Sequence, residues 1–189
     1  MNRAFQGFLV GAYGRDLWDL VRRDAGFDFE DFEPMLTYEP ALTTRLVKAA
    51  ARRLEKPGKS FMEDVGTWMI ANPDQSAIRR LMRFGGEDYR EFLFSLDELP
   101  DRAKMAVPHL EVPEISLEQK APNQVDLLIS WPKFDLSAVA LGALRAMADD
   151  YGALVLLTMQ ATGRLSARIE VELLDVSFSE GRSFSLSGA

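Results

Sequence analysis

The sequence predicts an α+β fold, in which an N-terminal helical subdomain precedes a subdomain with an antiparallel sheet and packed helices. Up to about residue 113, apolar side chains recur at the three- and four-residue spacing of amphipathic helices. After it, the runs "VDLLISW", "LVLLTMQAT" and "ARIEVELLDV" are typical of strands, and "FDLSAVALGALRAMADDYG" is typical of a helix. Because helices precede a β-α-β-β order, we expect an antiparallel sheet.

The N-terminal helices are predicted from apolar spacing and from residues that favour helix ends. The first is expected to run from Phe5 to Gly26, because glycine suits the left-handed conformation that follows many helices. A second is expected over residues 41–55, ending before "KPGK". A third is expected to begin at Ser60 and Glu63, whose spacing matches a capping box.

The segment before Pro100 is predicted to be a helix with one buried face, formed by Phe92, Leu93, Leu96 and Leu99. The proline then interrupts the pattern, and a second short helical pattern follows. Proline is well tolerated in the first turn of a helix, so it also suits the start of that second helix. The proline of "LEVPEIS" favours extended backbone, so a further short strand is expected there.

We expect one domain over residues 1–180. Its helical part covers residues 1–58, and the part with helices and the antiparallel sheet covers residues 59–180. Residues 181–189 are small and polar, and we expect a flexible tail there.

The composition excludes several classes of function. The chain has 189 residues, of which 29 are acidic and 22 basic, for a net charge of −7. Nucleic-acid binding needs clustered basic residues, so no nucleic-acid partner is expected. There is no cysteine, which removes disulfides, thiolate metal sites and cysteine nucleophiles. Since no run of about 18 apolar residues occurs, we expect no membrane insertion and a cytoplasmic location.

The sequence offers little catalytic chemistry. It contains no P-loop and no GxGxxG motif, and its only histidine, His109, lies beside a proline. The acidic run "DFEDFE" (residues 28–33) is read as an amphipathic loop held by its phenylalanines rather than as a metal site. A catalytic pocket needs converging polar groups, so we predict that the protein is not an enzyme.

Several motifs together resemble the heme nitric oxide/oxygen-binding (H-NOX, HNOB) family. The run "FLFSLDELPDRAKMAVPHLEVP" resembles the family's proximal segment, in which prolines follow the axial histidine by eight and thirteen positions. Pro108 and Pro113 stand in that register to Pro100. The runs "YGRDLWDLVRRDAG", "FMEDVGTWMI" and "GALRAMADDYG" resemble the family's first, glycine-containing and penultimate helices, in the same order.

The resemblance places Pro100 where the family has its axial iron ligand. Proline carries no donor atom for iron, so the usual proximal bond cannot form there. His109 and Met105 are weak alternative ligands. The family's Tyr-x-Ser-x-Arg propionate clamp is replaced by "ISWPKFD", where Lys133 is left to contact a propionate or another anion as a point charge.

The family pocket is expected to be apolar here. The resemblance implies that Pro100 borders it and that it is lined by Phe5, Leu9, Met69, Ile70, Val139 and Ala143. Two outcomes stay open. Large side chains such as Phe5, Trp68 and Trp131 fill the space, which we favour, or a cavity remains for an apolar small molecule such as an acyl chain.

These features together predict a stand-alone bacterial regulatory module with a degenerate heme site and no cofactor. By resemblance, it would act through a signalling partner such as a histidine kinase or a cyclic-dinucleotide enzyme. The alternative is a divergent heme protein that senses nitric oxide with non-standard iron ligation.

Overall fold

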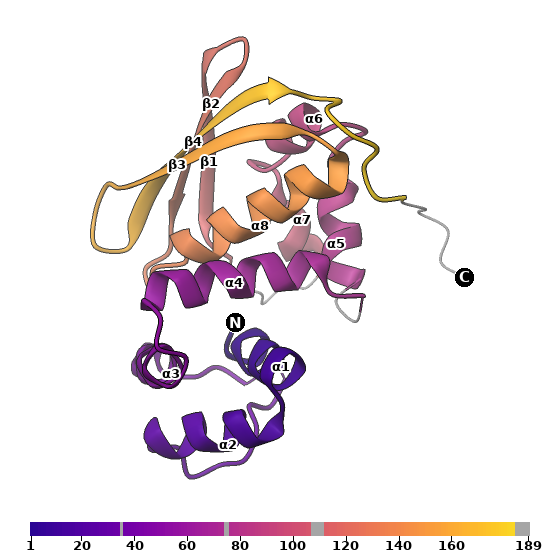
Figure 1. Ribbon diagram of the computed structural model, residues 1–189. Coiled ribbons are helices and arrows are strands. Elements are labelled where there is room, and N and C mark those ends of the chain that lie inside the picture. Colours follow the sequence, from indigo (N-terminus) through magenta and orange to yellow (C-terminus); the bar gives the residue numbers. More distant parts are fainter. Residues whose placement is uncertain (35, 74–75, 107–111, 184–189) are drawn as a thin grey trace.

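The computed structural model describes residues 1–34, 36–73, 76–106 and 112–183, so His109 and most of the expected tail lie outside the described residues. The described part contains helices and one antiparallel sheet (Figure 1). The elements are α1 (Asn2–Tyr13), α2 (Arg15–Asp24), α3 (Pro40–Arg53), α4 (Gly58–Ala71), α5 (Ser76–Arg83), α6 (Tyr89–Phe94), α7 (Leu99–Ala106), β1 (Glu114–Ala121), β2 (Gln124–Ser130), α8 (Ser137–Tyr151), β3 (Leu154–Ala161) and β4 (Ser166–Asp175). This order confirms the predicted α+β fold, including the strand expected around "LEVPEIS".

The four strands are ordered β1-β2-β4-β3, with every neighbouring pair antiparallel. Side chains alternate between the two faces, and Leu127 of β2 lies beside Leu117 and Ile169 on the inner face. Helix α8 packs on that face and supplies Leu144 and Met147. This interior, the sheet core, also receives α6 and comprises Ile70, Tyr89, Phe92, Leu93, Leu96, Leu127, Leu141, Leu144, Ala146, Met147, Ala148, Tyr151, Ala153, Ile169, Val171 and Leu173.

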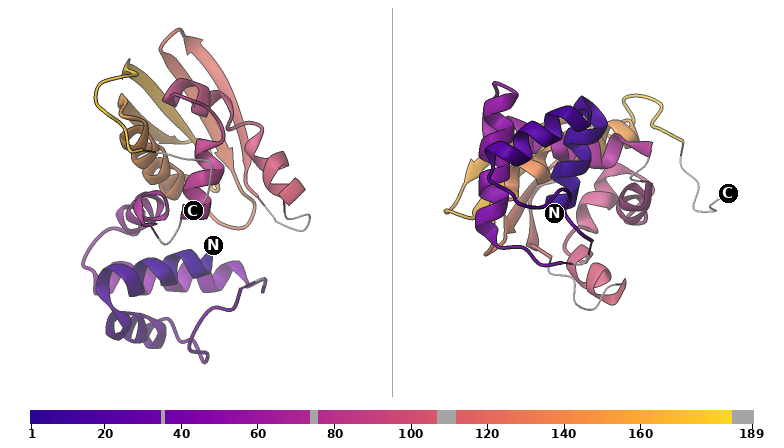
Figure 2. Two further views of the ribbon diagram at one scale, coloured as in Figure 1. Left: turned by 90° about the vertical axis from the view of Figure 1, so that its right-hand side faces the viewer. Right: turned by 90° about the horizontal axis from the view of Figure 1, so that it is seen from below.

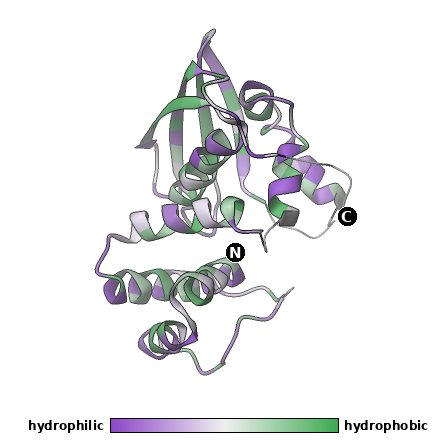
Figure 3. Cartoon of the chain, turned by 45° about the vertical axis from the view of Figure 1, so that its right-hand side comes forward, coloured by the Kyte–Doolittle hydropathy of each residue, from purple (hydrophilic) through white to green (hydrophobic). Residues whose placement is uncertain are grey.

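Helices α1, α2 and α3 form a separate group on the other side of α4 (Figures 1 and 2). Their apolar faces meet α4 and the start of α8 in the N-terminal core. It comprises Phe5, Phe8, Leu9, Trp18, Val21, Ala25, Phe27, Phe32, Leu46, Val47, Ala49, Ala50, Phe61, Met62, Val65, Leu136, Ala138 and Val139. Both the strands and the helices alternate between hydrophobic and hydrophilic residues in Figure 3. Such alternation is expected of helices that bury one face.

Helices α4 and α8 cross at two glycines. A Cβ atom on Gly66 would lie 1.9 Å from the carbonyl oxygen of Val139, and one on Gly142 would lie 1.9 Å from that of Glu63. The Thr67 hydroxyl donates a hydrogen bond to the Gly142 carbonyl at 3.3 Å. The crossing therefore brings the two backbones into direct contact and joins the N-terminal core to the sheet core.

The single helix predicted from Phe5 to Gly26 is wrong, because Gly14 divides it into α1 and α2. Gly14 has φ 88° and ψ 165°, a backbone conformation that favours glycine. Gly26 does follow α2 in the left-handed region, with φ 66°. The capping box predicted at Ser60 is also not seen, since α4 already begins at Gly58 and has no side-chain cap.

The segment before Pro100 is less regular than predicted. Helix α6 ends at Phe94, and residues 95–98 form a turn before α7. Phe92, Leu93 and Leu96 are nonetheless buried, so the buried apolar surface continues from α6 into the turn that follows it. None of the helices in the described ranges is long and apolar enough to cross a membrane.

Candidate functional site

Three aromatic rings meet where α1, α4 and the segment before α8 converge. The rings of Phe5 and Phe61 stack with their centroids 5.8 Å apart and 22° between the planes. The ring of Phe134 meets Phe5 edge-on at 6.2 Å. Phe5 and Phe61 are fully buried. These are favourable geometries for aromatic pairs, so the three rings pack as a stable filling of this interior.

Trp68 closes the neighbouring part of the interface between α1 and α4. Its indole lies along Gly7 and Gly11, where added Cβ atoms would be 3.1 and 3.4 Å away. The two glycines are one helical turn apart, so they form a shallow strip for the indole on α1. Phe8 completes the contact, with its centroid 6.1 Å from that of Trp68.

The predicted lining residues divide between the two cores. Phe5, Leu9 and Val139 belong to the N-terminal core, and Met69 is partly buried against it. Ile70 belongs instead to the sheet core, and Ala143 packs against that core. The structure thus brings together four of the six residues and places the other two on the far side of the α4–α8 crossing.

Pro100 is the second residue of α7 and is half-buried. Its missing N–H costs little at this position, because the first turn of a helix has no partners for its amides. Arg102 fixes α7 by donating a hydrogen bond from Nη2 to the Ser95 carbonyl at 2.8 Å. Met105 lies on the same helix and is 81% exposed.

Lys133 lies half-buried in the segment that joins β2 to α8. The Trp131 amide anchors that segment by donating to the Leu165 carbonyl at 3.2 Å. At its other end, Asp135 accepts hydrogen bonds from the Ser137 amide at 3.0 Å and from the Ser137 hydroxyl at 2.6 Å. The carboxylate therefore stabilises the start of α8, where the helix dipole favours a negative charge.

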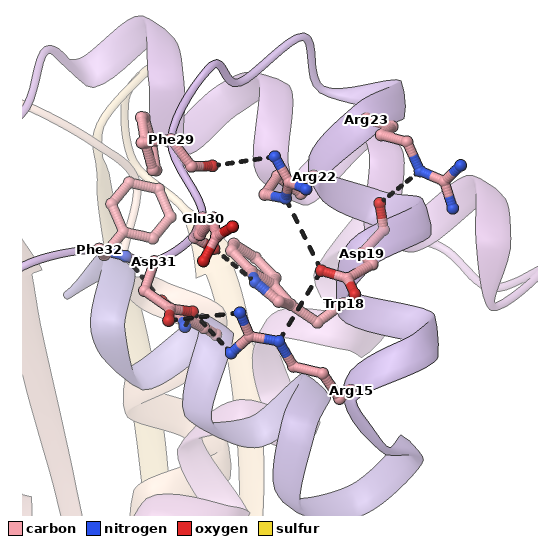
Figure 4. Close-up of polar contacts among 10 residues, drawn as sticks. Arg15, Trp18, Asp19, Arg22, Arg23, Phe29, Glu30, Asp31 and Phe32 are labelled. Atoms are coloured by element: carbon pink, nitrogen blue, oxygen red, sulfur yellow. Dashed lines mark hydrogen bonds and ion pairs between the residues drawn. The ribbon is translucent and has the colours of Figure 1, made fainter.

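The acidic loop at residues 27–34 is held by its aromatic side chains, as predicted. Phe27 and Phe32 are buried, and the Trp18 indole donates to the Glu30 carbonyl at 2.9 Å (Figure 4). Arg15 reaches both carboxylate oxygens of Asp31, at 2.8 and 3.3 Å. Across the described ranges, no group of three or more histidine or acidic residues is placed to hold a metal ion.

The family comparison matches this architecture. A model of the haem-NO-binding family, HNOB, matches residues 1–159. The chain belongs to this family. Solved H-NOX structures share the fold. The H-NOX protein from S. oneidensis in its Fe(II)NO state is 16% identical, with a TM-score of 0.76 over 93% of this chain and all of that chain.

Two further solved structures show the same similarity. The unliganded Fe(II) H-NOX protein from K. algicida is 12% identical, with a TM-score of 0.76 over 96% of each chain. A point mutant of the T. tengcongensis H-NOX protein is 15% identical, with a TM-score of 0.75 over 94% of this chain and all of that chain. The protein therefore has the fold of a heme NO/O2-sensing module.

Sequence reasoning missed two of the three rings in this aromatic cluster. Phe61 follows Ser60 in a predicted helix, and Phe134 is the first residue of the run "FDLSAVALGALRAMADDYG", which was read as a helix; neither was named as a pocket residue. Their partner Phe5 was named, together with Trp68 and Trp131. Trp131 is partly buried against the N-terminal core but is not one of these three rings. The helix begins only at Ser137, and the spacing within the run does not show which way the Phe134 side chain points.

Proposed function

We propose that this H-NOX family member is a regulatory module that works without heme and acts through a protein partner. The observation that carries the proposal is Pro100, which occupies the position of the axial ligand by resemblance and has no atom that can bind iron. The family match over residues 1–159 supports a domain that keeps the family fold while it lacks the axial iron ligand.

The interior also fits a porphyrin poorly. Phe5, Phe61 and Phe134 are in ring-to-ring contact in the N-terminal core, where apolar lining of a pocket was expected. Side chains packed at interior density leave few voids, so a porphyrin would have to displace them. The same packing favours the filled interior over a cavity for an apolar small molecule.

The remaining donors offer weak ligation. Met105 is the methionine nearest along the chain to Pro100, and its 81% exposure is unlike that of a ligand held in an apolar interior. Lys133 could contact a propionate as a point charge, but a single lysine lacks the fixed fork with which arginine binds a carboxylate. A heme-based nitric oxide sensor, the alternative function, would thus need iron ligation of an unusual kind.

The test is a hemin titration of protein purified after expression with a heme precursor, followed by absorption in the Soret region. We expect no saturable band at one equivalent for the wild-type protein. A sharp band at one equivalent would contradict heme independence and would support the alternative function. Substituting Met105 or His109 would then identify the ligand through a change in that band.

Two variants at one position separate ligand loss from a filled interior. Pro100→His restores an imidazole, and Pro100→Ala is the control that removes proline without adding a donor. A Soret band gained by Pro100→His alone would mean that only the ligand is missing. No band in either variant would mean that the aromatic packing also excludes porphyrin, in which case Phe5→Ala combined with Pro100→His is the next variant.

A further inference from the structure

The two edges of the sheet differ in charge. The edge strand β1 carries Glu114, Glu118 and Lys120. The opposite edge strand β3 has the sequence LVLLTMQA, and the charge-free run continues to Gly163. Edge strands present unpaired backbone groups, and proteins commonly protect them with charged residues, proline or bulges. β3 has neither charge nor proline, and its only irregularity lies at its start, between Leu154 and Val155.

Apolar side chains on and beside β3 are incompletely covered. On the outer face, Leu156 is 54% exposed, and Leu174 on the same face of β4 is 55% exposed. On the inner face, Leu157 is only half-buried, whereas its β4 neighbour Val171 is fully buried. The edge therefore leaves apolar surface on both faces that one additional strand would cover.

We propose that β3 pairs antiparallel with β3 of a second copy of this chain, which joins two four-stranded sheets into one. Pairing through the same strand of both copies has twofold symmetry, so it closes at a dimer and leaves the charged β1 edges outermost. Pairing of β3 with β1 would instead place a neutral strand against a charged one and would extend without closing.

The charge of the chain favours this edge over other surfaces for self-association. The net charge of −7 makes two copies repel through most of their surface. β3 offers a charge-free line of contact, with backbone hydrogen bonds as the main attraction. Its length of eight residues corresponds to about 27 Å of strand, enough for a continuous ladder.

The register of the pairing follows from the alternation of the side chains. If the twofold axis passes through Leu157, Leu157 faces Leu157 of the second copy, and Val155 faces Met159 of the second copy on the inner face. If the axis passes through Thr158, Leu157 faces Met159 of the second copy. Both arrangements bring apolar side chains together across the strands, which stabilises an antiparallel pair.

The first test is the molecular mass by light scattering across a concentration series. We expect the wild-type protein to reach twice the monomer mass of 21.2 kDa. Leu156→Lys should return the mass to that of a monomer, because it places a charged side chain in the uncharged line of contact on each copy. Within one chain the new lysine faces Glu172, its β4 neighbour, so the fold should persist.

Ser116→Lys is the matched control, because it adds the same charge to the outer face at the opposite edge. We expect this variant to remain dimeric. A wild-type protein that stays monomeric at every concentration would overturn the proposal. That holds even if β3 then proves to bind a strand of another protein. A dimer that Leu156→Lys leaves intact would overturn it as well.

Cysteine crosslinking provides a second readout that does not depend on a destabilising change. The chain has no cysteine, so each introduced thiol is unique. Leu156→Cys, Thr158→Cys and Gln160→Cys place thiols along the exposed face of β3. Fastest linking of Thr158→Cys indicates the register centred on Thr158, and equal linking of Leu156→Cys and Thr158→Cys indicates the register centred on Leu157. Ser116→Cys is expected to stay unlinked, and preferential linking there would contradict the β3 pairing.

Discussion

Gly66 of α4 and Gly142 of α8 lie at one helix crossing, where each helix occupies the space that a side chain on the other would need. The missing Cβ of each residue would fall 1.9 Å from a carbonyl oxygen across the interface. Carbonyl oxygens cannot move aside as a flexible side chain can. The crossing therefore fixes the distance between the N-terminal core and the sheet core.

Gly142→Ala is expected to lower the free energy of unfolding. The added methyl group forces the helix backbones apart, and overpacking of this kind costs about 1–3 kcal/mol, occasionally more. The measurement is urea denaturation followed by circular dichroism. The control is Gly11→Ala on α1, where the new Cβ would lie an ordinary 3.4 Å from Trp68.

Gly11→Ala should leave the stability unchanged or raise it, because alanine favours a helix over glycine by up to about 1 kcal/mol. Equal losses in both variants would mean that glycine acts through helix conformation or flexibility, not through the close approach of α4 and α8.

The general fold could be predicted from periodicity, but the close approach of α4 and α8 could not. Thr67 and Gly142 meet although they are 75 residues apart, and spacing within one segment carries no information about such pairs. The break at Gly14 was missed for a related reason, since apolar residues continue on both sides of it. Its conformation became clear only from φ.

The candidate site was predicted unevenly. Phe5, Leu9 and Val139 do share one core, because each lies on the apolar face of a helix; that they line a ligand pocket stays a prediction. Ile70 and Ala143 were assigned to the same interior but pack with the sheet core. Helices α4 and α8 contribute to both cores, and a helical pattern does not reveal which apolar residue faces which interior.

Asp150→Asn is expected to loosen the C-terminal segment from α5. The Asp150 side chain is 1% exposed and accepts a hydrogen bond from Arg79 Nε at 2.8 Å, and Arg83 Nε lies 3.6 Å from its second oxygen. Arg79 also donates to the Ser183 carbonyl at 3.1 Å. Loss of the charge should lower the free energy of unfolding by about 1.5–3 kcal/mol, the usual value for a hydrogen bond to a charged group.

The measurements are urea denaturation and the rate of tryptic cleavage at Arg182, which lies next to Ser183. The neighbouring Asp149 is exposed, so Asp149→Asn is the matched control and should change the stability by less than about 0.5 kcal/mol. If both variants are cleaved at the wild-type rate, the Asp150 side chain does not hold this segment in place.

The stability of the fold should fall at alkaline pH because of two tyrosines in the sheet core. Burial raises the pKa of Tyr89, and its hydroxyl donates to the Leu144 carbonyl at 3.0 Å. Burial also raises the pKa of Tyr151 to about 12, and its hydroxyl donates to the Gly86 carbonyl at 2.9 Å. Both hydrogen bonds need the protonated phenol.

The unfolded chain loses these protons at its ordinary pKa of about 10, while the folded protein keeps them. Stability from the raised pKa values is therefore fully present below pH about 10. It is lost as the pH rises toward 12, by up to about 1.4 kcal/mol per pH unit for each tyrosine. Urea denaturation at a series of pH values measures this slope.

Tyr89→Phe should reduce the alkaline slope, because the variant has one fewer buried proton to keep. At neutral pH the same variant should be less stable by about 1 kcal/mol, since its hydrogen bond to the Leu144 carbonyl is lost. Tyr13→Phe, at a residue that is 43% exposed, is the control for the loss of any tyrosine. An alkaline slope that Tyr89→Phe and Tyr13→Phe change equally would exclude Tyr89 as a source of the pH dependence.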